Sequence, residues 1–150
     1  MTRLVLKVEV LPHGEGLELP RYATEGSVGL DLCAAVPEEN PTRVYPGSRK
    51  LIPTGLRMQI PAGHEAQIRP RSGLARKHGV VVLNTPGTID EDYRGEVKVL
   101  LVSHSNTPFD VERGMRIAQM VIAPVTKVVI EEGELDDTPR GDGGFGHTGL

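Results

Sequence analysis

The stretch MRIAQMVIAPVTKVVI, residues 115–130, decides the fold class. Valine and isoleucine dominate it, and side chains of this β-branched type favour the pleated surface of a sheet. Pro124 has no backbone N–H to donate, so we expect it to divide the stretch into two strands. In the first of these strands Ile117 has the phase of a core residue, which leaves Arg116 and Gln119 as polar residues at the flank of the strand.

The rest of the chain continues this pattern of short apolar runs punctuated by glycine and proline. Further strands are expected at 4–10, 64–70, 79–84 and 96–105, where residues alternate in polarity or are β-branched. Residues 50–61 are expected to hold short strands interrupted by Pro53 and Gly55. Only SGLARKHG, residues 72–79, has the character of a short helix, with Ser72 as its cap and Gly79 as its end. The sequence therefore predicts an all-β sandwich or barrel with one short helix.

Composition narrows the range of partners. The chain of 150 residues has a formal net charge of −3 at pH 7, so we expect no nucleic-acid polymer as a partner. Its longest apolar runs, such as VLLV at 99–102, are too short to span a bilayer, and the first ten residues lack the apolar run of a secretory signal. The single cysteine, Cys33, excludes an internal disulfide and is typical of a reducing compartment, so we expect a cytoplasmic protein.

The end of the chain has a different character. From residue 132 the strand pattern stops, and EGELDDTPRGDGGFGHTGL follows, with one aromatic ring and many glycines. A backbone of this kind is costly to order, so we expect a mobile, glycine-rich C-terminal arm. Residues 1–150 are thus predicted to form a single domain, with a β core over 1–131 and the arm over 132–150.

Four internal segments stand out from the strands. SVGLDLCAA (27–35) places a carboxylate, Asp31, in an apolar stretch. Asp31 is either part of a functional site or a turn or edge residue that hydrogen-bonds the backbone. RPRSGLARKHG (69–79) sets arginines before a helix start, which suits a phosphate but also fits an ordinary cap with solvated arginines. NTPGTIDEDYRGE (84–96) is a long acidic connection that is either functional or merely solvated, and GMRIAQM (114–120) says little alone.

Together these segments favour a phosphorylated small molecule. A carboxylate beside arginines repels phosphate, so its presence there needs a functional explanation. Two such functions are holding Mg²⁺ through water and deprotonating an attacking water. An aromatic ring on a mobile arm suits stacking on a flat base. The sum is a nucleotide pocket with hydrolytic chemistry.

Five stretches in this order resemble the five sequence motifs of the dUTP pyrophosphatases (dUTPases). They are GLDL, RPRSGLA, NTPGTIDEDYRGE, GMRIAQ and RGDGGFGHTG, and they span nearly the whole chain. The resemblance implies a β jelly-roll subunit, a homotrimer, and three active sites at subunit junctions. It implies Mg²⁺-assisted hydrolysis of dUTP to dUMP and pyrophosphate, which limits uracil in DNA and supplies dUMP for dTMP synthesis.

The resemblance also assigns roles to residues of this chain. Asp90 matches the carboxylate that deprotonates the water attacking the α-phosphorus, and Asp31 matches the one that helps to place Mg²⁺ through water. Tyr93 matches the ring that packs on the deoxyribose and excludes a 2′-hydroxyl, and Asn84 matches the amide that reads uracil. The other expected substrate contacts are Arg71, Ser72, Gly73, Gly87, Ile89, Gln119, Arg140, Phe145, Gly146, His147 and Thr148.

The sequence departs from the family pattern in the arm. His147 stands where the family usually has serine, so we expect the affinity of the arm for phosphate to vary with pH. Two alternatives to dUTP hydrolysis remain open. One is a dCTP deaminase of the same superfamily, with Glu91 or Glu96 as its catalytic glutamate, and the other is a catalytically silent nucleotide-binding module.

Overall fold

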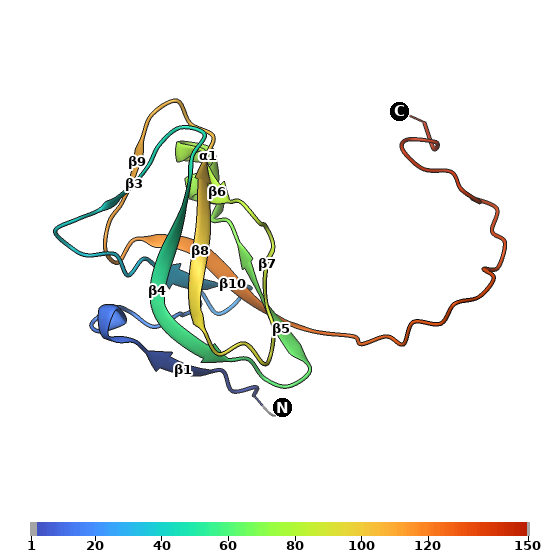
Figure 1. Ribbon diagram of the computed structural model, residues 1–150, viewed down its shortest axis with the longest axis horizontal. Helices are drawn as coiled ribbons and strands as arrows, with labels where there is room; N and C mark the ends of the chain where they lie inside the picture. The colour runs from blue at the N-terminus through green and yellow to red at the C-terminus, as the bar shows by residue number, and fades with distance from the viewer. Residues whose placement is uncertain (1–2, 150) are drawn as a thin grey trace.

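The computed structural model describes residues 3–149, and its framework is two four-stranded antiparallel sheets that face each other (Figure 1). The first sheet has the order β1 (Lys7–Val10), β4 (Arg49–Gln59), β8 (Glu96–Ser103) and β6 (Val80–Val82). The second has the order β2 (Leu30–Cys33), β10 (Arg116–Pro124), β5 (His64–Arg69) and β7 (Gly87–Ile89). A separate ribbon pairs β3 (Thr42–Val44) with β9 (Phe109–Val111). This is the all-β, jelly-roll-like sandwich that the sequence predicts.

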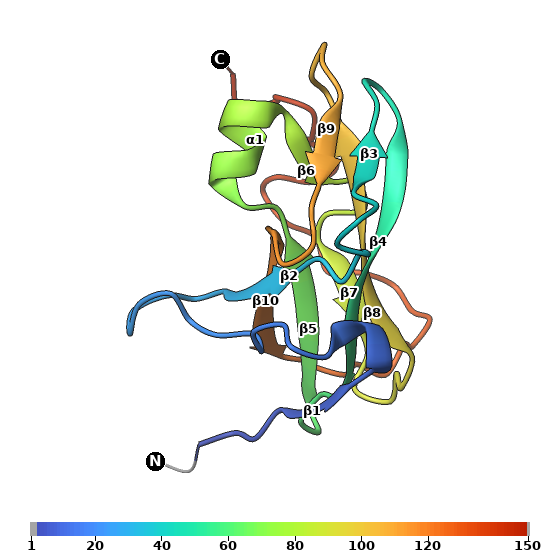
Figure 2. The same cartoon turned by 90° about the vertical axis from the view of Figure 1, so that its left-hand side faces the viewer.

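Two short helical elements complete the fold. Figure 2 shows α1 (Ser72–His78) at one end of the sandwich, and β1 with the 3₁₀ turn η1 (Pro12–Gly14) at the other. The expected helix end is confirmed, because Gly79 adopts the left-handed conformation with φ of 63°. The expected cap is wrong: Arg71 is the N-cap, and no side chain caps the first turn. Among residues 3–149 there is no helix long and apolar enough to cross a membrane.

Aliphatic side chains from both sheets form the core. β10 lies in the interior of its sheet and buries Ile117 and Met120, which pack in one cluster with Leu32 and Leu101 from other strands. The pairing of β10 with β2 shifts between Arg116 and Ala118, which marks a bulge near the start of the strand. The apolar stretch that decides the fold class therefore supplies the middle of one sheet.

The aromatic side chains lie mostly outside this core. Tyr22, Tyr45 and Tyr93 are each about half exposed, and Phe145 is fully exposed. Only Phe109 packs partly against the core, and its ring centroid lies 5.1 Å from that of His78. The scarce aromatic rings are therefore free for other roles.

Three expected boundaries differ in the structure. Residues 49–59 form one long strand, β4, whose register shifts between Pro53 and Arg57 instead of breaking into separate strands. β10 ends at Pro124, and residues 125–130 form no second strand. The segment that includes Asp31 is a strand, β2, which the sequence pattern did not predict because its apolar run is very short.

The connection at 84–96 is more than a loop. After β6 the chain leaves the first sheet, adds β7 to the edge of the second sheet, and then returns to the first sheet as β8. The peptide bond between Thr85 and Pro86 within it is cis. The connection thus carries its polar residues along the outer edge of the second sheet.

The chain after Pro124 runs away from the sandwich, as Figure 1 shows. Val128, Val129 and Ile130 are 77%, 96% and 92% exposed. Three consecutive apolar side chains of this kind are costly to leave in water. Residues 128–130 are therefore an apolar stretch that the single chain leaves uncovered.

The N-terminal turn packs on β4 with no space to spare. A Cβ atom at the buried Gly14 would lie 2.6 Å from the carbonyl oxygen of Gly55 and 2.9 Å from its Cα. The backbone N–H of Leu11 also donates to the Gly55 carbonyl, at 2.8 Å. Only a residue without a side chain fits at position 14.

We therefore expect Gly14→Ala to lower the free energy of unfolding by about 1–3 kcal/mol, the usual cost of overpacking. Gly26→Ala is the matched control, since a Cβ there would meet nothing within 4 Å. Chemical denaturation at equal protein concentrations measures both. A Gly14→Ala protein as stable as the Gly26→Ala protein would contradict the close packing.

Candidate functional site

A polar hollow of ≈ 270 Å³ lies where β2 and β10 meet the start of α1. Asp31 comes from β2, and Gln119 comes from the adjacent position on β10. Arg71 is the N-cap of α1, and Ser72 and Gly73 are the first two residues of that helix. The structure thus brings five of the predicted site residues around one hollow.

The charges in this hollow are organised around Asp31. Its carboxylate accepts from Arg116 Nη1 at 3.1 Å and forms an ion pair with Arg71 Nε at 3.3 Å. Arg71 is also fixed to the strand, because its Nη1 donates to the main-chain oxygen of Arg116 at 3.1 Å. Two guanidinium groups and one carboxylate leave a net positive charge, which suits a phosphate ligand.

The first turn of α1 adds main-chain donors to the hollow. Ser72 and Gly73 are exposed, and no side chain caps the backbone N–H groups there. Uncapped N–H groups at a helix start are unsatisfied donors that a ligand can use. The hollow therefore combines guanidinium groups, free N–H groups and the Ser72 hydroxyl.

Gln119 is held in place from two sides. Its side-chain amide donates to the carbonyl of Pro70 at 2.9 Å. On the other side a Cβ at Gly29 would overlap the Gln119 side chain, so only glycine leaves room for it. Gln119 therefore braces the turn that carries Arg71.

A second hollow, of ≈ 480 Å³, lies between β7 and β8. Ile89, Asp90, Tyr93 and Glu96 are among the residues that line it. The hydroxyl of Tyr93 donates to the main-chain oxygen of Glu96 at 3.0 Å, and its ring covers Gly95, where a Cβ would clash with the ring. The second hollow thus offers a carboxylate and a half-exposed aromatic ring.

Asn84 and Gly87 lie toward the opposite end of β7 from Asp90. A Cβ at Gly87 would lie 3.4 Å from Nδ2 of the exposed Asn84, so the amide lies beside this glycine. Gly87 pairs with Ile68 near the end of β5, which places both residues on the Arg69 side of that strand.

The two hollows are separate within one chain. Their lining residues do not overlap. Ile89 pairs with Ala66, so Asp90 follows beside Glu65, six residues before Arg71, which is roughly 20 Å of extended chain. A single chain therefore does not place Asp90 next to the arginines.

The arm residues lie apart from both hollows. Arg140 donates from Nε to the carbonyl of Gly143 at 2.8 Å, and His147 lies against the same glycine. Phe145, Gly146 and Thr148 are exposed, and Phe145 has a positive φ of 47°. Neither hollow is lined by a residue of the arm in the part of the chain that the structure describes.

A magnesium ion fits the first hollow, which we call the phosphate hollow, only as part of a complex with substrate. No group of three histidine, cysteine, aspartate or glutamate side chains that could hold a metal exists among residues 3–149. Mg²⁺ usually binds to one or two carboxylates plus substrate phosphates and keeps several waters. Asp31, alone beside two arginines, matches that manner of binding and could not form a cage by itself.

Two site residues escaped the sequence analysis. Arg116 was interpreted only as a polar residue at a strand flank, and its contact with Asp31 depends on cross-strand pairing that the sequence does not reveal. Glu96 was considered as an acidic residue of the connection and, with Glu91, as a possible deaminase glutamate, whereas in the structure its main-chain oxygen accepts from the Tyr93 hydroxyl. The one sequence feature that could have indicated this contact is the spacing of three residues between Tyr93 and Glu96.

Comparisons with known proteins agree on one family. Residues 15–149 match the family model of dUTPase. The chain is 64% identical over 141 residues to the deoxyuridine 5'-triphosphate nucleotidohydrolase of Sinorhizobium medicae, covering 93% of this chain and 88% of that protein. It resembles the solved structure of a Staphylococcus bacteriophage 80alpha dUTPase mutant with dUpNHpp, with a TM-score of 0.85, 22% identity, and coverage of 97% of this chain and 99% of that chain.

A second similar solved structure is described as containing a metal ion. It is a mutant dUTPase from phage phi11 of S. aureus that reveals the coordination of a structural Mg(II) ion. Its TM-score is 0.76 at 21% identity, over 88% of this chain and 98% of that chain. A divalent metal is therefore consistent with this fold.

We expect Arg71→Ala to weaken the binding of inorganic pyrophosphate with Mg²⁺ by about tenfold or more, because charged hydrogen bonds are worth ~1.5–3 kcal/mol. Arg69→Ala is the matched control, since Arg69 is exposed and donates to Gln67 instead. Isothermal titration calorimetry measures both affinities. Equal weakening by the two variants would show that only overall charge matters.

Proposed function

The chain belongs to the dUTPase family and hydrolyses dUTP to dUMP and pyrophosphate, and we propose that Asp90 is the base of this reaction. One observation carries the assignment: Asp90 lines the second hollow beside Tyr93, and among residues 3–149 its exposed carboxylate has no ion-pair partner. Asp31 is in contrast already held by two arginines. A free carboxylate next to an aromatic ring is the better candidate to accept a proton.

The proposed step is an attack by water on the α-phosphorus. Asp90 takes a proton from the water, the new oxygen–phosphorus bond forms, and the bond to the bridging oxygen of the β-phosphate breaks, so that pyrophosphate leaves. Arg71 and Gln119 orient the phosphates, and the guanidinium stabilises the charge that develops on them. Mg²⁺, held mainly by the phosphates with Asp31 reached through water, would supply further neutralisation of that charge.

We propose that a homotrimer completes each active site. Asp90 and the arginines are roughly 20 Å apart along the chain that joins them, too far to act on one triphosphate. A neighbouring copy brings its own Asp90 hollow to the phosphate hollow of the first. The exposed Val128, Val129 and Ile130 support an assembly, since contact with another copy removes them from water.

The remaining expected contacts fit this arrangement. In the second hollow the half-exposed Tyr93 packs on the deoxyribose and leaves no room for a 2′-hydroxyl. The exposed amide of Asn84 reads the edge of uracil, with Gly87 and Ile89 shaping the base pocket. These roles rest on the family motif, and the exposure of both side chains supports them.

The arm is proposed as a lid. Phe145 is fully exposed and stacks on the base when the arm closes, while Arg140 and His147 reach the phosphates together with the backbone of Gly146 and Thr148. Closing excludes water and aligns the reacting groups. We keep the cytoplasm as the proposed compartment, because a single free cysteine, Cys33, is typical of a reducing compartment. Partial burial raises the pKa of the Cys33 thiol, which favours its protonated form.

We expect Asp90→Asn to lower kcat for dUTP by about 10²–10⁴-fold, the usual contribution of a general base, with little change in binding of a non-hydrolysable analogue. Asp92→Asn, an exposed carboxylate two residues away, is the control and should keep its turnover. Chromatography of the products from dUTP, UTP, dTTP and dCTP measures the reaction. Normal turnover by Asp90→Asn would remove Asp90 as the base, and deamination of dCTP would indicate a different chemistry.

Phe145→Ala is expected to raise KM for dUTP about tenfold, because stacking of one base on an aromatic ring is worth roughly 1–3 kcal/mol. Leu135→Ala is the control, an equally exposed apolar residue that precedes the glycine-rich end. Steady-state kinetics at saturating Mg²⁺ compares the two. An unchanged KM for Phe145→Ala would contradict the stacking role.

A further inference from the structure

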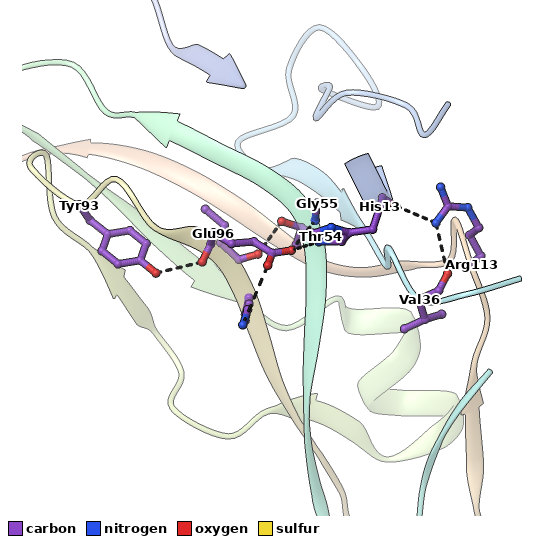
Figure 3. A network of polar contacts seen from close by, with 9 residues as sticks. His13, Val36, Thr54, Gly55, Tyr93, Glu96 and Arg113 are labelled. Atoms are coloured by element: carbon purple, nitrogen blue, oxygen red, sulfur yellow. Dashed lines mark hydrogen bonds and ion pairs between the residues drawn. The ribbon is translucent and has the colours of Figure 1, made fainter. Parts of the chain in front are cut away.

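A chain of polar contacts joins the second hollow to the N-terminal turn (Figure 3). At its centre is Glu96, the first residue of β8, whose side chain is only 15% exposed. The carboxylate oxygen Oε1 accepts from the backbone N–H of Gly55 at 2.9 Å and contacts Nε2 of His13 at 2.5 Å. Lys98 approaches the other oxygen only to 4.0 Å. We call these contacts the Glu96 clamp.

The N-terminal turn, which carries His13, is itself held in place by Arg113. Arg113, which precedes β10, donates from Nη1 to the main-chain oxygen of His13 at 2.8 Å and from Nη2 to that of Glu15 at 3.0 Å. Gly14 packs directly on Gly55, as described above. The backbone of His13 is therefore fixed by Arg113 and by the packing of Gly14, so the Glu96 carboxylate contacts a fixed partner.

Beside the second hollow, the main chain of Glu96 holds Tyr93. The phenol hydroxyl donates to the main-chain oxygen of Glu96, and this is the one hydrogen bond of that hydroxyl among residues 3–149. The ring is about half exposed, so packing alone does not fix it. Its position depends on where the backbone of Glu96 lies, and the Glu96 side chain ties that residue to Gly55 and His13.

We propose that Glu96 is a positioning residue for substrate selectivity: its carboxylate, bound to Gly55 and His13, fixes the acceptor that holds Tyr93 against the sugar. The inference rests on the proposed role of Tyr93 as the group that excludes a 2′-hydroxyl. An added hydroxyl is a small group, and a weakly held ring moves aside for it. A site that rejects it needs a ring locked by supporting hydrogen bonds.

The test is the ratio of kcat/KM for dUTP to kcat/KM for UTP. Glu96→Ala is expected to lower this ratio by about tenfold or more, chiefly through faster turnover of UTP. Glu96→Gln retains an oxygen that accepts from Gly55 and His13, so it should keep most of the ratio. His13→Ala removes one side of the clamp from an exposed position and should give an intermediate loss.

Asp110→Ala is the matched control, because it breaks an ion pair with Arg43 that lies on the β3–β9 ribbon and away from Tyr93. It should leave the ratio unchanged. A wild-type ratio in Glu96→Ala overturns the inference, as does equal loss in Glu96→Ala and Glu96→Gln. Should Glu96→Ala fail to fold, His13→Ala decides, and an unchanged ratio in that variant overturns the inference.

Tyr93→Ala separates the inference from the proposed function. If Tyr93→Ala loses the discrimination and Glu96→Ala keeps it, Tyr93 is the selective group and the clamp is not its support. If the wild-type protein and Tyr93→Ala show the same ratio, the proposed role of Tyr93 itself is wrong, and the inference falls with it.

Discussion

The phosphate hollow depends on the pairing of β10 with a strand on each side. Gln119 pairs with Asp31 of β2 on one side and with Arg69 of β5 on the other. Residues that are far apart in the sequence thus lie at one level of the sheet, and the turn after Arg69 carries Arg71 into the same hollow. Backbone hydrogen bonds set this arrangement, and the ion pairs of Asp31 refine it.

The same sheet explains why the candidate site is divided. β7 pairs with β5 in antiparallel register, so the chain that leaves β7 at Asp90 emerges beside Glu65, at the opposite end of β5 from Arg71. Polar residues of one site are thereby spread over two ends of a rigid element. In the proposed homotrimer a second copy of the chain would supply the missing half without any rearrangement of the sandwich.

Local sequence signals predicted much of this fold. The β-branched runs of β8 and β10 and the glycine that ends α1 follow from backbone and side-chain sterics, which act within a few residues. The signals failed where tertiary context decides: β2 is a short strand paired to β10, and Arg116 gains a partner only through that pairing. The grouping of Asp31 with Arg71 follows the family pattern, whereas the role of each residue stays a prediction.

The aliphatic core has a consequence for optical spectroscopy. The chain has no tryptophan, and its three tyrosines are each about half in solvent, so the packed interior holds few chromophores. Unfolding then changes the surroundings of the tyrosines only modestly. Ultraviolet absorbance and tyrosine emission therefore report mainly on events at the surface around Tyr22, Tyr45 and Tyr93, with little background from the interior.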